Sequence, residues 1–328
     1  MNEKILKTLK SVETEDWVDY HIVRPISYYM TRAFARFDVH PNTVTIWSMI
    51  VGAASCIFFA HGCLYYNGMA GLLWNLGGIL LLIIADLLDC TDGQLARMTG
   101  KKSRMGRILD GIAGYTWYIP IYTALVVRFF FHHDIEFGWF GIENTMTNTL
   151  IATAVVLALA LWSGLGGIGP QQRLADYYIQ IHLFFLKGEK GSELDNSIRQ
   201  QEIYDEMKHD PNVSTVEKIF QKSYVEYTQK QEGRTPQFQR LMRLLKEKFG
   251  NASNMPAEVR QSLHDHSLKI IPWNSLLTFN FRTLSLIVFT LIDMPVLNFL
   301  WEGIGMAILA YWINHRHEAF CKKIADTL

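Results

Sequence analysis

The chain has 328 residues, of which 49% are hydrophobic, and its 31 basic residues balance its 31 acidic residues. This balance gives no reason to expect a nucleic-acid partner, because such proteins carry an excess of positive charge. The four cysteines lack the spacing of a metal site, and we expect them to be apolar fillers and not a disulfide set. The neutral average conceals a division between strongly apolar and strongly polar segments.

The chain begins with a polar segment, residues 1–16, which has no apolar core long enough for a cleavable signal peptide. Residues 23–37 then mix arginines with aromatic and apolar side chains at helical spacing. We predict an amphipathic helix in the membrane interface, with Arg24, Arg32 and Arg36 directed toward lipid phosphates. The alternative is a surface helix packed on the polar segment that follows later in the chain. Residues 1–43 are thus expected to be a polar lead and an interfacial helix.

Six mostly apolar stretches are predicted to cross the membrane, because about 20 apolar residues in a helix span the hydrocarbon core. They are residues 44–64, 72–90, 108–131, 150–168, 273–292 and 296–313. Asn42 and Thr43, after Pro41, are a favourable start for the first of these helices. Residues 44–170 would hold the first four spans and residues 271–314 the last two.

Residues 171–270 are charged and polar, and we expect them to form a cytosolic helical insert. Apolar residues recur at helical spacing in residues 213–232 and 236–251, and Ser214 with Glu217 forms a plausible capping box. The insert contains no nucleotide-binding glycine pattern, and its function is not predicted. The predicted fold is all-α: a polytopic membrane protein of about six transmembrane helices with an N-terminal interfacial amphipathic helix and a cytosolic helical insert.

The distribution of basic residues predicts the orientation. The loop after the second span carries five of them, Arg97, Lys101, Lys102, Arg104 and Arg107. The loop between the third and fourth spans is acidic and aromatic, and the C-terminal tail, residues 315–328, is again basic. Because basic loops stay in the cytoplasm, we expect both termini on the cytoplasmic side.

One short stretch carries a pattern typical of metal and phosphate chemistry. DCTDGQLAR occupies residues 89–97, and Gly106 and Asp110 follow. On a helix, Asp89, Asp92, Gly93 and Ala96 fall on one side. A second helix carrying Gly106 and Asp110 would add a third carboxylate, and such oxygen ligands suit Mg²⁺ or Mn²⁺. A phosphate-bearing substrate would fit over the glycines.

This arrangement resembles the signature of the CDP-alcohol phosphotransferases, D-x-x-D-G-x-x-A-R, about eight residues, then G-x-x-x-D-x-x-x-D. The resemblance extends loosely to residues 40–45 and does not cover residues 171–269. It implies that Asp89, Asp92 and Asp110 bind divalent metals, and that the nucleotide site is lined by Gly93, Ala96, Arg97 and Gly106. The alternative is that these aspartates only cap helices and pair with Arg97 or Lys101.

The last aspartate of the family pattern is missing, because position 114 is Gly114. Its loss removes a metal ligand and the group that takes the proton from the attacking hydroxyl. Three explanations stay open: a natural variant with another base, a non-catalytic member, or an introduced substitution that traps substrate. Asp86, one turn before Asp89, is a candidate substitute base. We expect the family function with weak activity.

Other basic residues are candidates for binding a second phosphate-bearing group. Lys101, Lys102, Arg104 and Arg107 could do so, but their position in a cytoplasmic loop explains them equally well. Arg282 lies in the fifth span, where a guanidinium should face protein or a wet cavity. We expect it to bind the phosphate of the acceptor or the lipid, or to pair with an inward acid.

The resemblance implies an enzyme that transfers a phospho-alkyl group from a CDP-alcohol to an acceptor alcohol and releases CMP. CDP-diacylglycerol is the favoured donor, with inositol, inositol phosphate, glycerol phosphate or serine as acceptor. CDP-choline or CDP-ethanolamine with a lipid acceptor, including a ceramide, is the other option. We expect a bacterial inner-membrane protein in contact with membrane lipids, with a cytoplasmic active site and a homodimer. A non-catalytic nucleotide-lipid-binding protein and a transporter are the alternatives.

Overall fold

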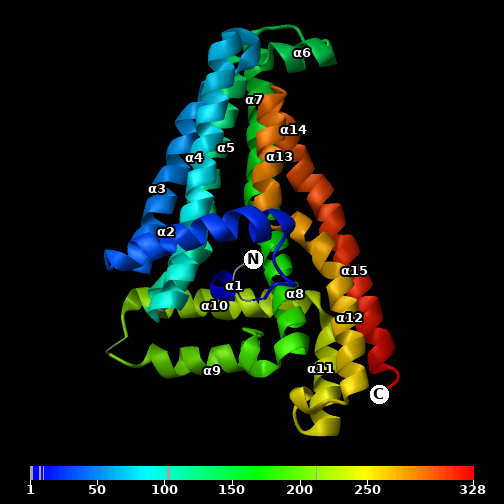
Figure 1. Ribbon diagram of the computed structural model, residues 1–328. Coiled ribbons are helices and arrows are strands. Elements are labelled where there is room, and N and C mark those ends of the chain that lie inside the picture. The colour runs from blue at the N-terminus through cyan, green and yellow to red at the C-terminus, as the bar shows by residue number, and fades with distance from the viewer. Residues whose placement is uncertain (1–2, 7–8, 10, 102–103, 212) are drawn as a thin grey trace. The chain divides into compact units, whose positions relative to one another are not determined.

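The computed structural model describes residues 3–6, 9, 11–101, 104–211 and 213–328, and these are mostly helical with no strand among them (Figure 1). The predicted all-α fold is therefore confirmed. The chain divides into two compact units. Unit 1 comprises Met1–Gly169 and Phe279–Gly305, and unit 2 comprises Pro170–Thr278 and Met306–Leu328.

Unit 1 consists of one amphipathic helix, a set of long apolar helices and several short elements. Its elements are α1 (Glu3–Leu6), η1 (Asp19–Val23), α2 (Arg24–Arg36), α3 (Pro41–Ala60), α4 (Leu64–Thr99), α5 (Arg104–Phe131), α6 (Asp134–Phe140), α7 (Met146–Leu161), η2 (Trp162–Ile168), α13 (Phe279–Leu291), α14 (Pro295–Leu300) and η6 (Trp301–Gly305).

Unit 2 consists of more polar helices and the last helix of the chain. Its elements are α8 (Gly169–Lys187), η3 (Glu189–Gly191), α9 (Ser197–Lys208), α10 (Thr215–Arg234), α11 (Pro236–Phe249), η4 (Ala252–Asn254), α12 (Ala257–Asn274), η5 (Ser275–Leu277) and α15 (Met306–Ala325).

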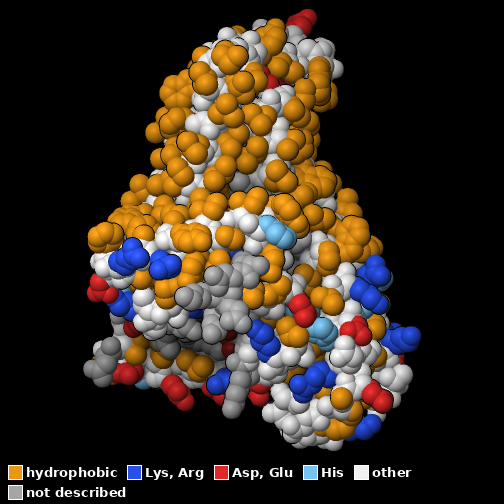
Figure 2. Space-filling model, viewed as in Figure 1, with side chains coloured by type: hydrophobic (Ala, Val, Ile, Leu, Met, Phe, Trp, Pro, Cys, Tyr) orange, Lys and Arg blue, Asp and Glu red, His pale blue; other side chains and the backbone are white. Residues whose placement is uncertain are grey.

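Four helical stretches among the described residues are long and apolar enough to cross a membrane. They are Pro41–Ala60, Leu64–Thr99, Met146–Lys187 and Pro295–Ala325. Figure 2 shows hydrophobic side chains over the outer surface of the unit 1 helices, as expected for helices that face lipid. The predicted spans of residues 44–64, 72–90, 150–168 and 296–313 each overlap one of the four stretches.

The other two predicted spans correspond to α5 and α13. The fifth span was predicted to begin at Trp273, but that residue belongs to α12. A 3₁₀ turn and the extended backbone of Thr278 separate α12 from α13, which has 13 residues. The apolar side chains on both sides of this break conceal it in the sequence. Helix α15 runs through most of the residues expected as a polar tail, 315–328.

Close packing of α3 against α4 and α5 forms the core of unit 1. A Cβ atom on Gly52 of α3 would lie 2.4 Å from the ring of Trp117, and one on Gly77 of α4 would lie 2.5 Å from Phe58. Glycine therefore lets the aromatic rings approach the neighbouring backbone directly. Phe59, Leu82 and Trp117 are almost completely buried in the resulting cluster.

The amphipathic segment forms the predicted helix α2, which lies along the second half of α4. Ser27 donates a hydrogen bond to the carbonyl oxygen of Leu87 at 3.2 Å, and Thr31 donates one to that of Thr91 at 3.3 Å. Tyr29 and Phe37 are exposed, which is typical of a helix in a membrane interface. The face opposite the exposed aromatics is thus attached to the backbone of the motif helix.

A buried ion pair connects α5 to the link between α13 and α14. The guanidinium of Arg128 pairs with the carboxylate of Asp293, and both side chains are buried. The same carboxylate accepts hydrogen bonds from the backbone of Leu64 at 3.1 Å and Tyr65 at 2.8 Å, where α4 begins. Asp293 thereby caps α4 and neutralises Arg128.

We expect Asp293→Ala to destabilise the protein by about 3–5 kcal/mol, because it leaves the Arg128 charge buried and uncaps α4. Thermal unfolding in detergent measures this loss. Asp326→Ala is the matched control, since Asp326 forms an exposed ion pair with Arg240 and its loss should cost less than about 1 kcal/mol. Equal shifts for the two variants would contradict the structural role of Asp293.

Unit 2 contains the predicted helices of the polar insert. The capping box of Ser214 and Glu217 is confirmed at the start of α10. Glu318 of α15 accepts hydrogen bonds from the backbone of Gln237 at 2.6 Å and Phe238 at 3.1 Å, and so caps α11.

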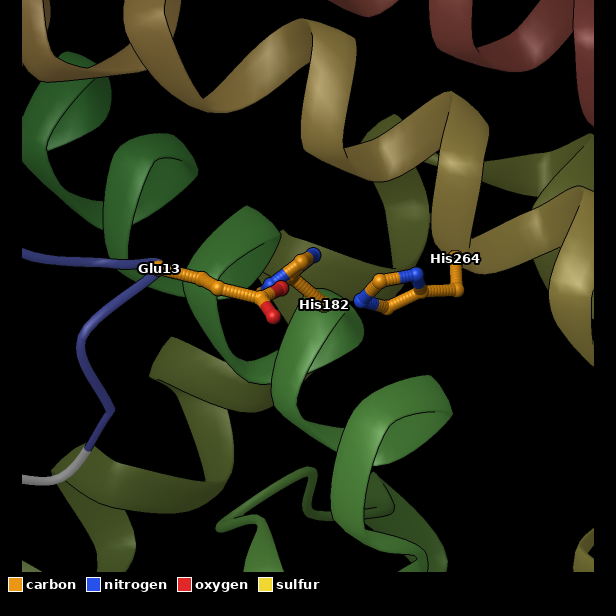
Figure 3. A group of neighbouring side chains, drawn as sticks. All are labelled: Glu13, His182 and His264. Atoms are coloured by element: carbon orange, nitrogen blue, oxygen red, sulfur yellow. The ribbon is translucent and has the colours of Figure 1, made fainter.

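Two histidines of unit 2 also join separate helices. The rings of His182 on α8 and His264 on α12 are stacked with centroids 5.0 Å apart (Figure 3). The Nδ1 atom of His182 lies 2.8 Å from the hydroxyl of Ser267, so α8 and α12 are linked by polar as well as aromatic contacts.

Candidate functional site

The acidic motif lies in the last turns of α4, as predicted. The helix continues from the apolar stretch through residues 89–97 and ends at Gly100, which has a positive φ of 71°. An L-residue with a side chain rarely adopts that conformation, so glycine is a natural stop here. The motif carboxylates therefore follow directly from a membrane-crossing helix.

The two aspartates of α4 differ in their surroundings. Asp92 is only 6% exposed and accepts a hydrogen bond from the hydroxyl of Thr45 on α3. Thr45 also contacts the carbonyl oxygen of Pro41 at 3.3 Å, within the first turn of α3. Asp89 is half-buried, and its Oδ1 atom is inaccessible to solvent. Asp92 and one carboxylate oxygen of Asp89 are thus shielded from water.

Arg97 folds back over Gly93. A Cβ atom at position 93 would lie 3.3 Å and 3.5 Å from the two terminal nitrogens of the guanidinium. Since residues four apart share a helix face, glycine at position 93 leaves the space that this guanidinium uses. Ala96 is half-buried beside it. The predicted small residues and the arginine are therefore adjacent on the same stretch of helix.

The N-terminal segment holds acidic residues that the sequence reasoning did not include, and Arg24, which was expected to face lipid phosphates, instead pairs with one of them. Glu15 pairs with Arg24 at 2.8 Å, and the side chain of Gln94 in the motif donates to the carbonyl oxygen of Arg24 at 3.4 Å. Asp16 accepts a hydrogen bond from the backbone of Asp19 at 2.8 Å. The density of acidic residues in the first twenty positions was the available signal.

Helix α5 carries the second half of the motif. Gly106 and Asp110 lie in this helix, as expected, but the side chain of Asp110 is outside the described part of the structure. The side chains of Arg104 and Arg107 are also outside it, as is all of Lys102. Lys101 forms an exposed ion pair with Asp38 at 2.6 Å, which lowers the pKa of the Asp38 carboxyl.

Position 114 is closed by an aromatic ring. A Cβ atom on Gly114 would lie 2.9 Å from the ring of Phe279, at the start of α13. The ring of Phe279 in turn packs edge-on against those of Trp117 and Tyr118, with centroid distances of 4.9 Å and 5.1 Å. The missing carboxylate has thus been replaced by an aromatic contact, and the space it would need is filled.

Arg282 lies in a buried polar network. Its guanidinium is fully buried and lies 3.9 Å from the carboxylate of Glu302. Glu302 also accepts hydrogen bonds from Tyr122 and from Ser163, the latter at 2.7 Å. Of the two expectations for Arg282, pairing with an inward acid is the arrangement that the structure shows.

A second group of ligand-type side chains lies in unit 2. His317, Glu318 and Cys321 place one ligand atom each within 4.8 Å of the others. The thiol of Cys321 lies 3.4 Å from Nε2 of His317. Because both carboxylate oxygens of Glu318 already cap α11, this group has a structural use without a metal.

Comparison with known proteins places the motif helices in one family. Residues 38–175 match the family described as CDP-alcohol phosphatidyltransferase. This part of the chain is similar to that family. The match covers less than half of the chain, from the start of α3 into α8, and includes the whole motif. No curated protein and no solved structure matches the chain.

The family resemblance inferred from the motif is thereby confirmed. CDP-alcohol phosphatidyltransferases transfer a phosphatidyl group from a CDP-alcohol, and they generally depend on a divalent metal. Together with the four apolar helices, the match indicates an integral membrane protein.

We expect Gly114→Asp alone to destabilise this CDP-alcohol phosphatidyltransferase domain by about 1–3 kcal/mol, because the new side chain overpacks the contact with Phe279. Because Phe279→Ala is itself destabilising, the comparison is made in that background, where adding Gly114→Asp should cost less than it does in the unmodified protein. Thermal unfolding in detergent measures both. The same loss in the presence and absence of Phe279 would show that steric conflict is not the cause.

Burial and the charge of Asp16 raise the pKa of Asp19 to about 7, against the opposing effect of Arg24. Ionised Asp19 is therefore less favourable in the folded state than in the unfolded state, and stability falls as pH rises from about 4 to 7. We expect Asp19→Asn to be more stable than the unmodified protein by an amount that grows between about pH 5 and pH 8 and reaches at most about 4 kcal/mol in the free energy of unfolding. The melting temperature of the variant, measured across this pH range, should rise accordingly relative to that of the unmodified protein.

Asp38→Asn is the control for this prediction, because the pKa of the exposed Asp38 carboxyl is lowered and not raised. Its melting temperature should not exceed that of the unmodified protein at about pH 8. A constant difference between Asp19→Asn and the unmodified protein across the pH range would refute the raised pKa.

Proposed function

We propose that the chain transfers a phospho-alkyl group from a CDP-alcohol to an acceptor alcohol, with release of CMP. The observation that carries this proposal is the end of α4, where Asp89, Asp92, Gly93 and Arg97 lie on consecutive turns inside a family-matched domain. Carboxylates and a guanidinium over a glycine form a surface suited to a metal-bound diphosphate.

The donor set at this site fits a divalent cation such as Mg²⁺ or Mn²⁺. Asp89 and Asp92 offer only oxygen ligands, and both are removed from bulk water, so two adjacent negative charges favour a bound cation. We assign these two aspartates and Asp110 as the metal ligands. When bound, the metal neutralises negative charge on the diphosphate and on the departing CMP.

The residues of the chain itself would hold the donor. Gly93, Ala96 and Gly106 leave room for the nucleotide close to the helix backbone, and the Arg97 guanidinium is placed to donate hydrogen bonds to phosphate oxygens. Thr45 orients Asp92 by its hydrogen bond, which fixes the direction of the remaining carboxylate lone pairs. Basic residues of the loop between α4 and α5, Lys101, Lys102, Arg104 and Arg107, are candidates for the acceptor or lipid phosphate.

The site would face the cytoplasm, in a bacterial inner membrane, because the basic loop follows directly from the motif. A lipid-linked donor would enter between helices while a polar acceptor arrives from the cytoplasm. CDP-diacylglycerol remains the favoured donor, and a homodimer remains the expected assembly. Arg282 is not needed for donor binding in this arrangement, since Glu302 already accompanies it.

The test is CMP release by the purified full chain in detergent, with Mg²⁺ or Mn²⁺ and a panel of CDP-alcohols and acceptors. We expect Asp89→Asn and Asp92→Asn each to lower the rate by at least about 100-fold, because each removes a metal ligand. EDTA should abolish release and added Mg²⁺ should restore it. Glu202→Gln is the matched control, since Glu202 is exposed on α9 and lies outside the matched domain.

A nucleotide-lipid-binding protein without turnover is the second candidate, and the ring of Phe279 over Gly114 favours it. Metal-dependent binding of CDP with no CMP release from any donor would support that function. Loss of CMP release that is the same for Glu202→Gln and Asp89→Asn would exclude a role specific to the motif.

A further inference from the structure

The N-terminal segment contacts the start of α13, whose first residue covers the position that lacks its family carboxylate. Asp16 accepts a hydrogen bond from the side chain of Asn280 at 2.9 Å. Asn280 directly follows Phe279, the residue that covers Gly114. The other oxygen of the Asp16 carboxylate holds the backbone of Asp19 at 2.8 Å. Two hydrogen bonds thus connect Asp19 to the start of the helix that closes position 114.

Asp19 differs from its acidic neighbours in what its carboxylate contacts. Glu15 is engaged by Arg24, and Asp16 by Asn280 and the backbone of Asp19. The Oδ1 atom of Asp19 is buried and accepts no hydrogen bond from any of the described residues. A buried carboxylate oxygen without a donor is costly, and such groups are retained where a ligand or a proton supplies the missing partner.

The charges around Asp19 connect it with the motif helix. The carboxylates of Asp16, Asp86 and Glu15 raise its pKa, Arg24 lowers it, and burial is the largest effect, so that its value is about 7. A carboxylate of this kind is suited to accept a proton near neutral pH. Asp86 belongs to α4, one turn before Asp89, so one of the charges that act on Asp19 comes from the motif helix.

We propose that Asp19 is the general base of the transfer reaction and replaces the family carboxylate absent at position 114. The acceptor hydroxyl gives its proton to the Asp19 carboxylate as its oxygen bonds to the phosphorus that carries the alkyl group. The bond from that phosphorus to the bridging oxygen breaks, and CMP leaves with the electron pair. Asp16 acts as a positioning residue through its bonds to Asp19 and Asn280. This inference rests on the proposed function.

Asp19 is preferred to Asp86 for this role because of its connection to α13. Asp86 lies within the apolar helix, whereas Asp19 is held by Asp16 to the residue beside Phe279. In this arrangement Phe279 fills the space beside position 114. The carboxylate that acts as the base then comes from the segment before α2 and not from α5.

The experiment compares CMP release by the unmodified chain, Asp19→Asn, Asp86→Asn and Glu202→Gln at saturating CDP-diacylglycerol, Mg²⁺ and the most effective acceptor. We expect Asp19→Asn to lower kcat by about 10²–10⁴-fold, with CDP binding in the presence of Mg²⁺ within about threefold of the unmodified chain. Retained CDP binding also shows that the variant folds. In the unmodified chain kcat should fall below about pH 7, where Asp19 becomes protonated, and this fall should be absent in Asp19→Asn.

A rescue variant separates a base from a structural residue. Gly114→Asp with Phe279→Ala, added to Asp19→Asn, returns a carboxylate to the family position with room for it, and should recover at least about tenfold in kcat. Full activity of Asp19→Asn, or a loss confined to Asp86→Asn, overturns the inference. The inference is also overturned if Asp19→Asn loses kcat, binds CDP normally and is not recovered by the rescue variant.

Failure of the proposed function has a different outcome. If the unmodified chain is silent but Gly114→Asp with Phe279→Ala releases CMP, Asp19 is not a base and the family reaction stands. If neither releases CMP from any donor in the panel, the proposed function fails, and the inference fails with it.

Discussion

Acidic groups at the end of an apolar helix lose hydration, and the structure around the motif compensates for that loss. Asp92 accepts a hydrogen bond from Thr45 of α3, and Arg97 lies over Gly93 on the same helix. Helix α2 is attached to the backbone of α4 through Ser27 and Thr31, which brings Arg24 and the acidic N-terminal segment to the same helix. Because unpaired buried charge costs several kcal/mol, these contacts stabilise the motif carboxylates. Hydrogen bonds and ion pairs therefore connect the motif, helix α2 and the N-terminal segment.

Unit 1 contains two further places where buried charges neutralise each other. Arg128 and Asp293 neutralise each other where α4 begins, and Arg282 and Glu302 do so within the bundle. In each case the acid also receives hydrogen bonds from other groups, from the backbone of Leu64 and Tyr65 or from Ser163. Charged residues at membrane depth usually suggest a binding site. Here these two pairs and their hydrogen-bond partners join separate helices, and we interpret them as structural.

The family match and the structure divide the chain differently. The match ends within α8, yet unit 1 also requires α13 and α14, which return after more than a hundred residues of polar sequence. Phe279 of α13 contacts position 114, where this chain departs from the family pattern, and Asn280 contacts the acidic N-terminal segment. Residues outside the family match thus contact position 114 and the N-terminal segment.

The sequence by itself determined the helical class, the apolar stretches, α2, the capping box of α10 and the family, because each depends on local periodicity or fixed spacing. The motif residues on α4 could be predicted as neighbours, since residues three and four apart share a helix face. Only the tertiary structure decided what partners they have. The contact of Phe279 with Gly114, the bond from Asn280 to Asp16 and the pairing of Arg282 with Glu302 join residues separated by 20 to 264 positions. No local pattern encodes such contacts, because they depend on how the helices pack, and packing is set by the shapes of many side chains together.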